Sequence, residues 1–196
     1  DESKVWPLAQ EIIPEEKRTG LPDKSMPAPS IRKYQLASEG QSIEESELPS
    51  IILRNNFFDS RYNPEGGSGS YLVDNGDGLT VTDIATDIMW QRGGVDICSI
   101  KSMHTKVNEL NANKLAGFSD WRLPTTEEAL SLLKPKTNSK GLHLHNCFSK
   151  EQPFIFLADQ RLPGGYWFAD LRQGNIFWAS GFNPGGFGRV CRTVAG

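Results

Sequence analysis

Aromatic and polar side chains gather in the last third of the chain, in the segments GYWFAD and NIFWASGF and the turns around them. Sugar rings present apolar faces and hydroxyl edges, so proteins bind them by stacking on aromatic rings and by hydrogen bonds from planar polar groups. Some of these rings are also expected in the core, because a fold with short strands needs large side chains to exclude water. Our candidates for ligand binding are Tyr166, Trp167, Asp170, Arg172, Asn175, Trp178 and Asn183.

The segment DNGDGLTVTD offers a second kind of chemistry, because several oxygen donors lie close together in it. Asp74, Asn75, Asp77 and Asp83 could supply hard ligands to a calcium ion. The segment lacks the twelve-residue loop with a terminal bidentate Glu, however, and its Asn-Gly and Asp-Gly steps are typical of tight turns. We therefore expect a structural hairpin without a cofactor, and we keep a calcium site as the alternative.

A third pattern is the alternation of His143, His145 and Cys147, which would share one face of a strand. Imidazole and thiolate groups suit zinc or copper, and His104 is the only other histidine that could contribute a fourth ligand. The alternative is a pair of exposed histidines beside a buried or bonded cysteine. No nucleophile elbow and no phosphate-binding glycine loop followed by lysine accompanies these residues.

The composition favours a turn-rich fold with short strands, since 19 Gly and 12 Pro accompany a hydrophobic content of 37%. A net charge of −3 argues against general nucleic-acid binding, which requires a basic surface. No apolar run approaches eighteen residues, so we expect no membrane span.

Several segments predict the helices and strands that would position the candidate site residues. Five prolines predict an extended tail or tether over residues 1–40. Acidic residues followed by apolar ones predict a short helix over 44–57. Alternating apolar residues on both sides of the turn predict a hairpin over 71–83, and Ile88 to Trp90 form a further short strand.

Two more helices follow. Ser99 can cap a helix whose apolar stripe consists of Ile100, Met103, Val107 and Leu110. Thr125 and Glu128 have the spacing of a capping box, which begins a helix. Pro135 ends that helix. We interpret Trp90 and Trp121 as core residues, and Arg122 as held by an internal carboxylate such as Asp120.

The order of these segments resembles a known bacterial family. DNGDGLTVTD, DIMWQRGG, SIKSMHTKVNEL and AGFSDWRLPTTEEALSLL are similar to the hairpin, "GLMWQ" strand, helix and "SDWRLPT" segment of the Lcl C-terminal domain family, named for a collagen-like adhesin. The resemblance implies an α+β, C-type-lectin-like fold, in which two short helices pack on small twisted antiparallel sheets beside an irregular N-terminal extension. The domain would span residues 41–196, with 41–62 as a helical lead-in.

The resemblance also bears on the three cysteines, an odd number that leaves at least one thiol unpaired in the monomer. Many relatives have one cysteine in the middle of the helix, where this chain has Val107. In an oxidising compartment we expect a disulfide between Cys147 and Cys191, while pairing of Cys98 with either of them stays open.

By resemblance, we expect a protein of the bacterial envelope, located in the periplasm, at the cell surface or outside the cell after removal of a leader. Its expected function is that of a non-enzymatic ligand-binding or adhesion module that recognises a glycan or a protein surface. Two alternatives stay open: a structural or assembly domain of a homo-oligomeric surface protein, and a metal-dependent enzyme that uses His143, His145 and Cys147.

Overall fold

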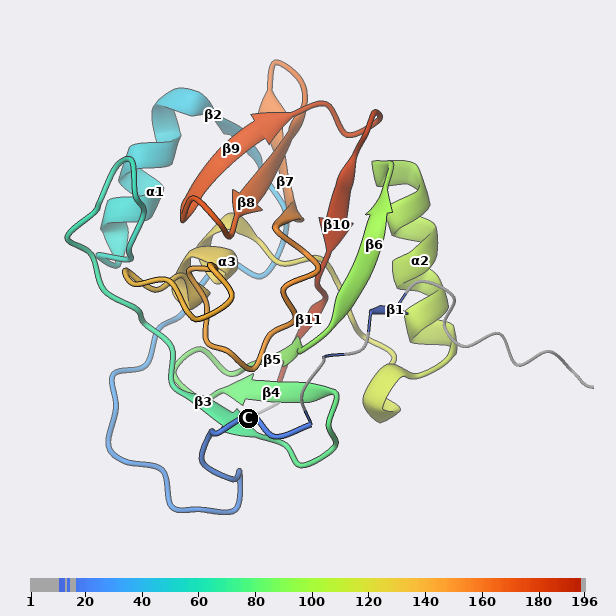
Figure 1. The fold of residues 1–196 in the computed structure, drawn as a ribbon. Coiled ribbons are helices and arrows are strands. Elements are labelled where there is room, and N and C mark those ends of the chain that lie inside the picture. Colours follow the sequence, from blue (N-terminus) through green and yellow to red (C-terminus); the bar gives the residue numbers. More distant parts are fainter. Residues whose placement is uncertain (1–10, 13, 15–16, 195–196) are drawn as a thin grey trace, which may run out of the picture.

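The computed structural model describes residues 11–12, 14 and 17–194, and it has an α+β fold built on two sheets (Figure 1). The larger sheet has the strand order β1-β6-β10-β7-β8-β9, and β2 pairs with β7 off this path. Its strands are β1 (Glu11–Ile12), β2 (Ser42–Glu44), β6 (Gly94–Cys98), β7 (Phe154–Leu162), β8 (Tyr166–Asp170), β9 (Asn175–Ala179) and β10 (Gly186–Gly188). The α+β class predicted from the sequence is confirmed.

The larger sheet is mixed, which corrects the expectation of antiparallel sheets. Both β2 and β10 run parallel to β7, whereas β8 runs antiparallel to it. Parallel neighbours must come from distant parts of the chain, because a hairpin can join only antiparallel strands. The pairing of Ser42 with Gln160 is such a contact, and no local pattern signals it.

The smaller sheet contains the expected hairpin. Its order is β11-β5-β4-β3, with β3 (Leu72–Asp74), β4 (Thr80–Asp83), β5 (Ile88–Gln91) and β11 (Cys191–Thr193), all antiparallel. Gly76 and Gly78 have φ values of 78° and 74°, which a residue with a Cβ adopts only under strain. The turn glycines therefore fix the register of the hairpin.

Within the described residues, three α-helices and two 3₁₀ turns complete the fold. They are η1 (Glu45–Glu47), α1 (Leu48–Arg54), α2 (Ile100–Ala112), η2 (Leu115–Gly117) and α3 (Thr126–Leu132). Ser99 accepts the amide of Ser102 at the start of α2, and Thr125 forms the predicted capping box with Glu128. Both local predictions are confirmed.

Trp90 and Trp121 are 0% and 2% exposed, so their interpretation as core residues is confirmed. An internal carboxylate holds Arg122 as expected, but it is Glu128 and not Asp120. Arg122 makes two hydrogen bonds to Glu128, at 2.6 and 2.7 Å, while Asp120 pairs with Arg192 instead.

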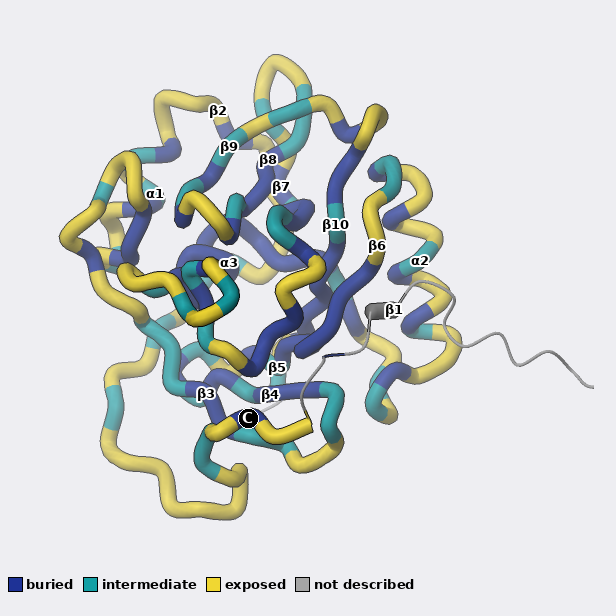
Figure 2. Tube along the Cα trace, in the orientation of Figure 1, coloured by how far each residue is buried: buried dark blue, intermediate teal, exposed yellow. Residues whose placement is uncertain are grey.

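Residues 17–40, which we expected to belong to a tail, run in extended form along the body of the molecule. The Thr19 hydroxyl donates to Asp74 at 2.7 Å, and the Tyr34 amide donates to the carbonyl of Ala85 at 2.8 Å. Figure 2 shows that this segment alternates between exposed stretches and points that approach the core. Within the described residues, no helix is long and apolar enough to cross a membrane.

Candidate functional site

The predicted ligand-binding residues on β8 and β9 are divided between the two faces of the sheet. In the antiparallel register, Trp167 pairs with Trp178, and Asp170 pairs with Asn175. Because side chains alternate along a strand, Tyr166 and Asp170 project to the face opposite Trp167. Trp167 is 1% exposed, and its indole nitrogen donates to the carbonyl of Ile43, so it belongs to the core.

Three further candidates, Asp170, Arg172 and Asn175, lie at the turn between β8 and β9. The carboxylate of Asp170 accepts the amides of Arg172 and Gln173, at 3.0 and 2.9 Å, which closes the turn. Arg172 is exposed and Asn175 half-buried. Asn183 lies exposed in the loop after β9, which follows the other end of that strand. The seven candidates therefore do not form one site.

Trp178 is the most exposed of the aromatic candidates. Its side chain is 46% exposed, and the guanidinium of Arg161 lies 3.6 Å from the centre of its ring. Arg161 is itself fixed, since it donates to Glu45 at 2.9 and 2.7 Å and to the carbonyl of Gly164 at 3.0 Å. The indole ring is thus held in place before any ligand arrives.

Two more apolar side chains are exposed at this end of the larger sheet. Leu162 is 45% exposed and lies in the β7–β8 hairpin, and Phe182 is 68% exposed and lies in the loop after β9. We call Leu162, Trp178 and Phe182, together with Arg161, the aromatic end. It lies at the top of Figure 1, where the β7–β8 hairpin and the loop after β9 meet the solvent.

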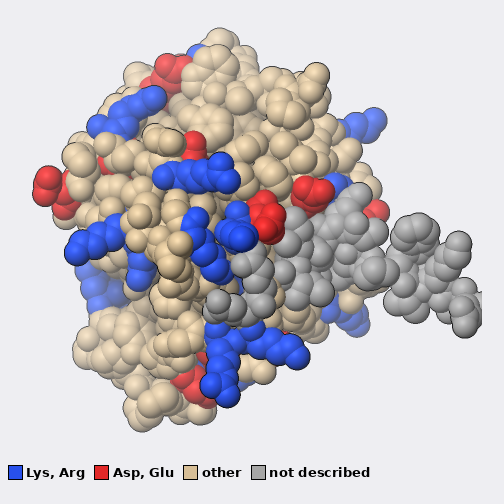
Figure 3. All heavy atoms as spheres, viewed as in Figure 1, with Lys and Arg blue, Asp and Glu red and all other residues tan. Residues whose placement is uncertain are grey.

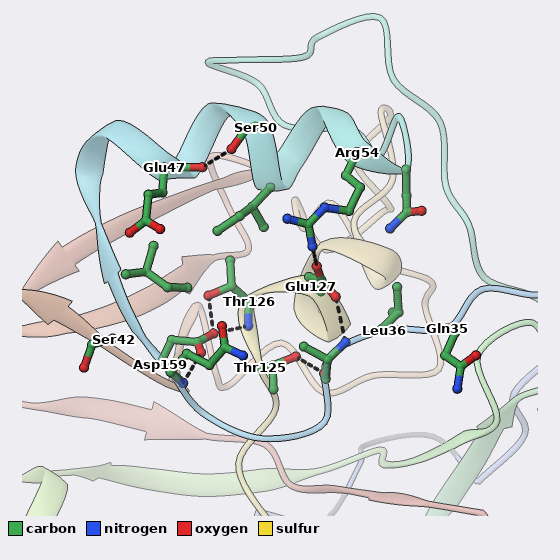
Figure 4. A pocket seen from close by; sticks show the side chains of 15 residues that line it. Gln35, Leu36, Ser42, Glu47, Ser50, Arg54, Thr125, Thr126, Glu127 and Asp159 are labelled. Atoms are coloured by element: carbon green, nitrogen blue, oxygen red, sulfur yellow. Dashed lines mark hydrogen bonds and ion pairs between the residues drawn. The ribbon is translucent and has the colours of Figure 1, made fainter.

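A cleft of about 430 Å³ opens beside α1 (Figure 4). Residues 35–43 form one wall and α1 forms the other, while Thr125, Thr126 and Asp159 lie between them. Figure 4 shows Arg54 of α1 reaching toward Glu127, while Glu47 lies in η1, just before α1. The volume of the cleft falls within the range of ~300–1,000 Å³ that is usual for small-molecule pockets.

Two buried carboxylates organise the cleft. Glu127 accepts Arg54 at 2.5 Å through one oxygen and the amide of Ala37 at 2.7 Å through the other. Asp159 accepts the amide of Gln41 at 2.7 Å, and both the amide and the hydroxyl of Thr126 at 2.7 Å. These bonds satisfy the oxygens of both carboxylates and hold residues 37–41 on the body of the molecule.

The segment of β2 and η1 connects the cleft with the aromatic end. Ser42, Ile43 and Glu47 line the cleft. Between them in sequence lies Glu45, which binds the Arg161 that covers Trp178. The two features therefore flank one short segment of chain.

Basic side chains gather elsewhere, on the face shown in Figure 3. The loop between α3 and β7 contains Lys134, Lys136, Lys140 and Lys150, and the sequence has no Asp or Glu between Glu128 and Glu151. We call residues 134–150 the basic loop. None of its residues lines the cleft, so the cleft and the basic loop offer different electrostatic surroundings.

The calcium site that we kept as an alternative has no support in the structure. Asp74 accepts the amide of Gly76, and Asp77 accepts those of Leu79 and Thr80, so these carboxylates stabilise the turn. Asp83 is fully buried at the other end of β4 and accepts the amides of Tyr71 and Ala85. In the chain as described, no group of three His, Cys, Asp or Glu side chains could hold a metal ion.

The side chains proposed as zinc or copper ligands also make other contacts. The Nδ1 atom of His143 lies 2.8 Å from the carbonyl of Lys134, and its ring stacks on Phe58. His145 accepts the amide of Cys147 at 3.0 Å. Burial raises the pKa of the Cys147 thiol to about 12, which disfavours the thiolate that a metal would need.

The structure contains no disulfide between Cys147 and Cys191. Cys98, Cys147 and Cys191 are all free thiols. Cys191 is buried beside Arg122 and Glu128, whereas Arg92 and Arg189 contribute to the electrostatic environment of Cys147. Cys147 and Cys191 therefore have different polar surroundings within the core, and Cys98 is half-buried.

Sequence reasoning missed Arg161, Glu45 and Phe182, as well as the cleft. Glu45 and Arg161 are 116 residues apart, so no spacing rule could have joined them. Phe182 stands in an Asn-Pro turn, where an exposed aromatic side chain is a usable signal.

Comparison with known proteins gives one match. The family model for the Lcl C-terminal domain matches residues 79–192, which is more than half of the chain, and confirms the resemblance seen in the sequence. No curated protein and no solved structure matches the chain significantly.

Proposed function

The chain belongs to the Lcl C-terminal domain family, and from this premise we propose that it is a non-enzymatic module of the bacterial envelope that binds a glycan or a protein surface. The proposal includes the C-type-lectin-like fold that the resemblance implies. It also includes a location in the periplasm, at the cell surface or outside the cell. A fold alone does not determine function, which depends on the residues of the site.

The observation that carries the proposal is the exposed indole of Trp178 beneath Arg161. A ring that is already fixed loses little conformational entropy when a ligand stacks on it. Arg161 adds hydrogen-bond donors beside the ring, and its ion pair with Glu45 keeps it there. Such a pair suits a sugar ring, and it equally suits an apolar side chain with a neighbouring carbonyl group.

Leu162 and Phe182 are further exposed apolar residues at the same end of the sheet. Isolated exposed apolar residues are ordinary, but aromatic side chains that gather beside polar groups are typical of interfaces. The partner would contact strand ends and loops, which a rigid sheet positions.

The test is binding to a glycan array and to envelope extracts with Trp178→Ala and Phe182→Ala variants. We expect at least a tenfold loss of affinity for Trp178→Ala, since hot-spot aromatics contribute about 2 kcal/mol or more. Tyr62→Ala is the matched control, because Tyr62 is an exposed aromatic residue outside the aromatic end. Binding that is unchanged in Trp178→Ala would refute the site.

One observation favours the alternative of a homo-oligomeric assembly domain. Among the described strands β9 pairs only with β8, and its sequence NIFWA contains neither Lys nor Pro to protect the free edge. Light scattering at increasing concentration tests this function. A dimer that Trp178→Lys abolishes, with no glycan bound by the native protein, would favour assembly.

A further inference from the structure

We infer that the cleft beside α1 is a second subsite for the same ligand, and that this ligand is a neutral, linear oligosaccharide extending from Trp178 across β2 and η1. The inference rests on the proposed function and names its ligand class. It depends on the polar groups of the cleft, on their charge balance and on the position of the cleft relative to Trp178.

The exposed lining of the cleft suits hydroxyl groups. Gln41 and Asn55 contribute amides, which both donate and accept hydrogen bonds as vicinal hydroxyls do. Leu36 and Ile51 provide apolar contact for the C–H faces of a sugar ring. Arg54 is largely exposed while it binds Glu127, so the outward side of its guanidinium remains accessible to a ligand.

The charge balance excludes a polyanion from the cleft. Its charged lining residues are Glu47, Glu127 and Asp159 against Arg54 alone. A sulfate or uronate group would therefore meet an excess of negative charge. A cationic ligand is also disfavoured, because the buried carboxylates of Glu127 and Asp159 already have their donors. A neutral ligand can bind while the carboxylates of Glu127 and Asp159 keep their present hydrogen bonds.

The position of the cleft supports one extended ligand rather than two separate ones. Glu45 binds the arginine that covers Trp178, and Glu47, two residues later, lines the cleft. A chain of several sugar units could contact both subsites, and each additional contact would raise the affinity through effective concentration.

The experiment compares cellohexaose, maltohexaose and chitohexaose with their disaccharides by isothermal titration calorimetry. For the best hexasaccharide, we expect the native protein to bind at least tenfold more tightly than it binds the corresponding disaccharide. The cleft variant Gln41→Ala/Asn55→Ala should lose this gain while disaccharide affinity at Trp178 changes less than twofold. Gln173→Ala/Asn113→Ala is the matched control, because it removes the same two amide types outside the cleft.

A second measurement does not depend on stability. Backbone amide NMR shifts of Ala37, Gln41 and Asn55 should change on addition of the hexasaccharide and stay unchanged with the disaccharide. Dextran sulfate serves as the charged probe, and any shifts that it causes are expected at the basic loop.

Each result has a distinct meaning. If the cleft variant binds hexasaccharide as the native protein does while Trp178→Ala weakens it, the second subsite is refuted and the proposed function stands. If no neutral hexasaccharide binds the native protein, the inference is refuted, and binding of a protein through Trp178 would still leave the proposed function in place. Dextran sulfate shifting the cleft amides would also refute the inference.

Discussion

Arg161 joins two distant parts of the chain, because its guanidinium lies 3.6 Å from the ring centre of Trp178 and 2.7 Å from a carboxylate oxygen of Glu45. We expect Arg161→Ala to lower the free energy of unfolding by about 1 kcal/mol, the magnitude of a partly exposed cation–π contact. The affinity for ligands stacked on Trp178 should fall about fivefold, as 1 kcal/mol implies. Urea unfolding and tryptophan fluorescence measure the two effects. Arg172→Ala is the control, and an equal loss in both variants would contradict a specific role.

Asp159 anchors the wall of the cleft, since its buried carboxylate accepts hydrogen bonds from Gln41 and Thr126. Asp159→Ala leaves these donors without their partner and should destabilise the protein by about 3 kcal/mol. Residues 35–44 should then become sensitive to limited proteolysis before the rest of the chain unfolds. Uniform proteolysis along the chain would count against this anchor.

The two arginine–carboxylate pairs around the "SDWRLP" segment should differ in strength. Glu128 is 1% exposed and binds Arg122 through two bonds, so Glu128→Ala should cost about 3–5 kcal/mol. Asp120 is 59% exposed, although its partner Arg192 is only 10% exposed, so Asp120→Ala should cost about 1 kcal/mol. Equal midpoints in guanidinium chloride for the two variants would be inconsistent with this difference.

Asp83 gives the protein a pH dependence with a defined sign. Burial raises the pKa of its carboxyl in the folded state above the usual 3.8, although the amide of Tyr71 and the hydroxyl of Thr86 oppose the shift. The folded state therefore favours the protonated carboxyl. This contribution to stability is complete below pH 3.8 and is lost as the pH rises through the folded-state pKa. Asp83→Asn should accordingly be more stable than the native protein at pH 7, with a smaller difference at pH 3, as thermal unfolding can show.

The three thiols should differ in reactivity. Burial raises the pKa of all three thiols, but Cys98 is only half-buried, whereas Cys147 and Cys191 are 2% and 0% exposed. One equivalent of thiol reagent should react in the folded protein at pH 8, and three should react in denaturant. Cys98→Ser should remove the fast equivalent. A mass two daltons lower than expected for three thiols would instead indicate a disulfide.

The elements that depend on local spacing could be predicted from the sequence. Thr125 and Glu128 form reciprocal capping hydrogen bonds within a single helical turn, and Gly76 and Gly78 allow the tight turn of the hairpin. The helix start and the hairpin therefore both appear as expected. The site could not be predicted in the same way. Trp167 and Trp178 look alike in the sequence, but the contacts of Trp167 with residues more than a hundred positions away leave it buried. Trp167 and Trp178 are cross-strand partners on one face of the sheet, so distant segments such as β2 decide which of the two is covered.

The placement of Ile43, Leu48 and Ile52 has a practical meaning for anyone expressing this protein. All three belong to the same buried cluster as Trp90 and Leu130, yet they precede the stretch that the family match covers. A gene fragment cut to the boundaries of that match would expose the apolar surface that these side chains now shield, and we expect it to aggregate. Expression designs should therefore start upstream of Thr19, whose hydroxyl is the first described side-chain tie to the rest of the body.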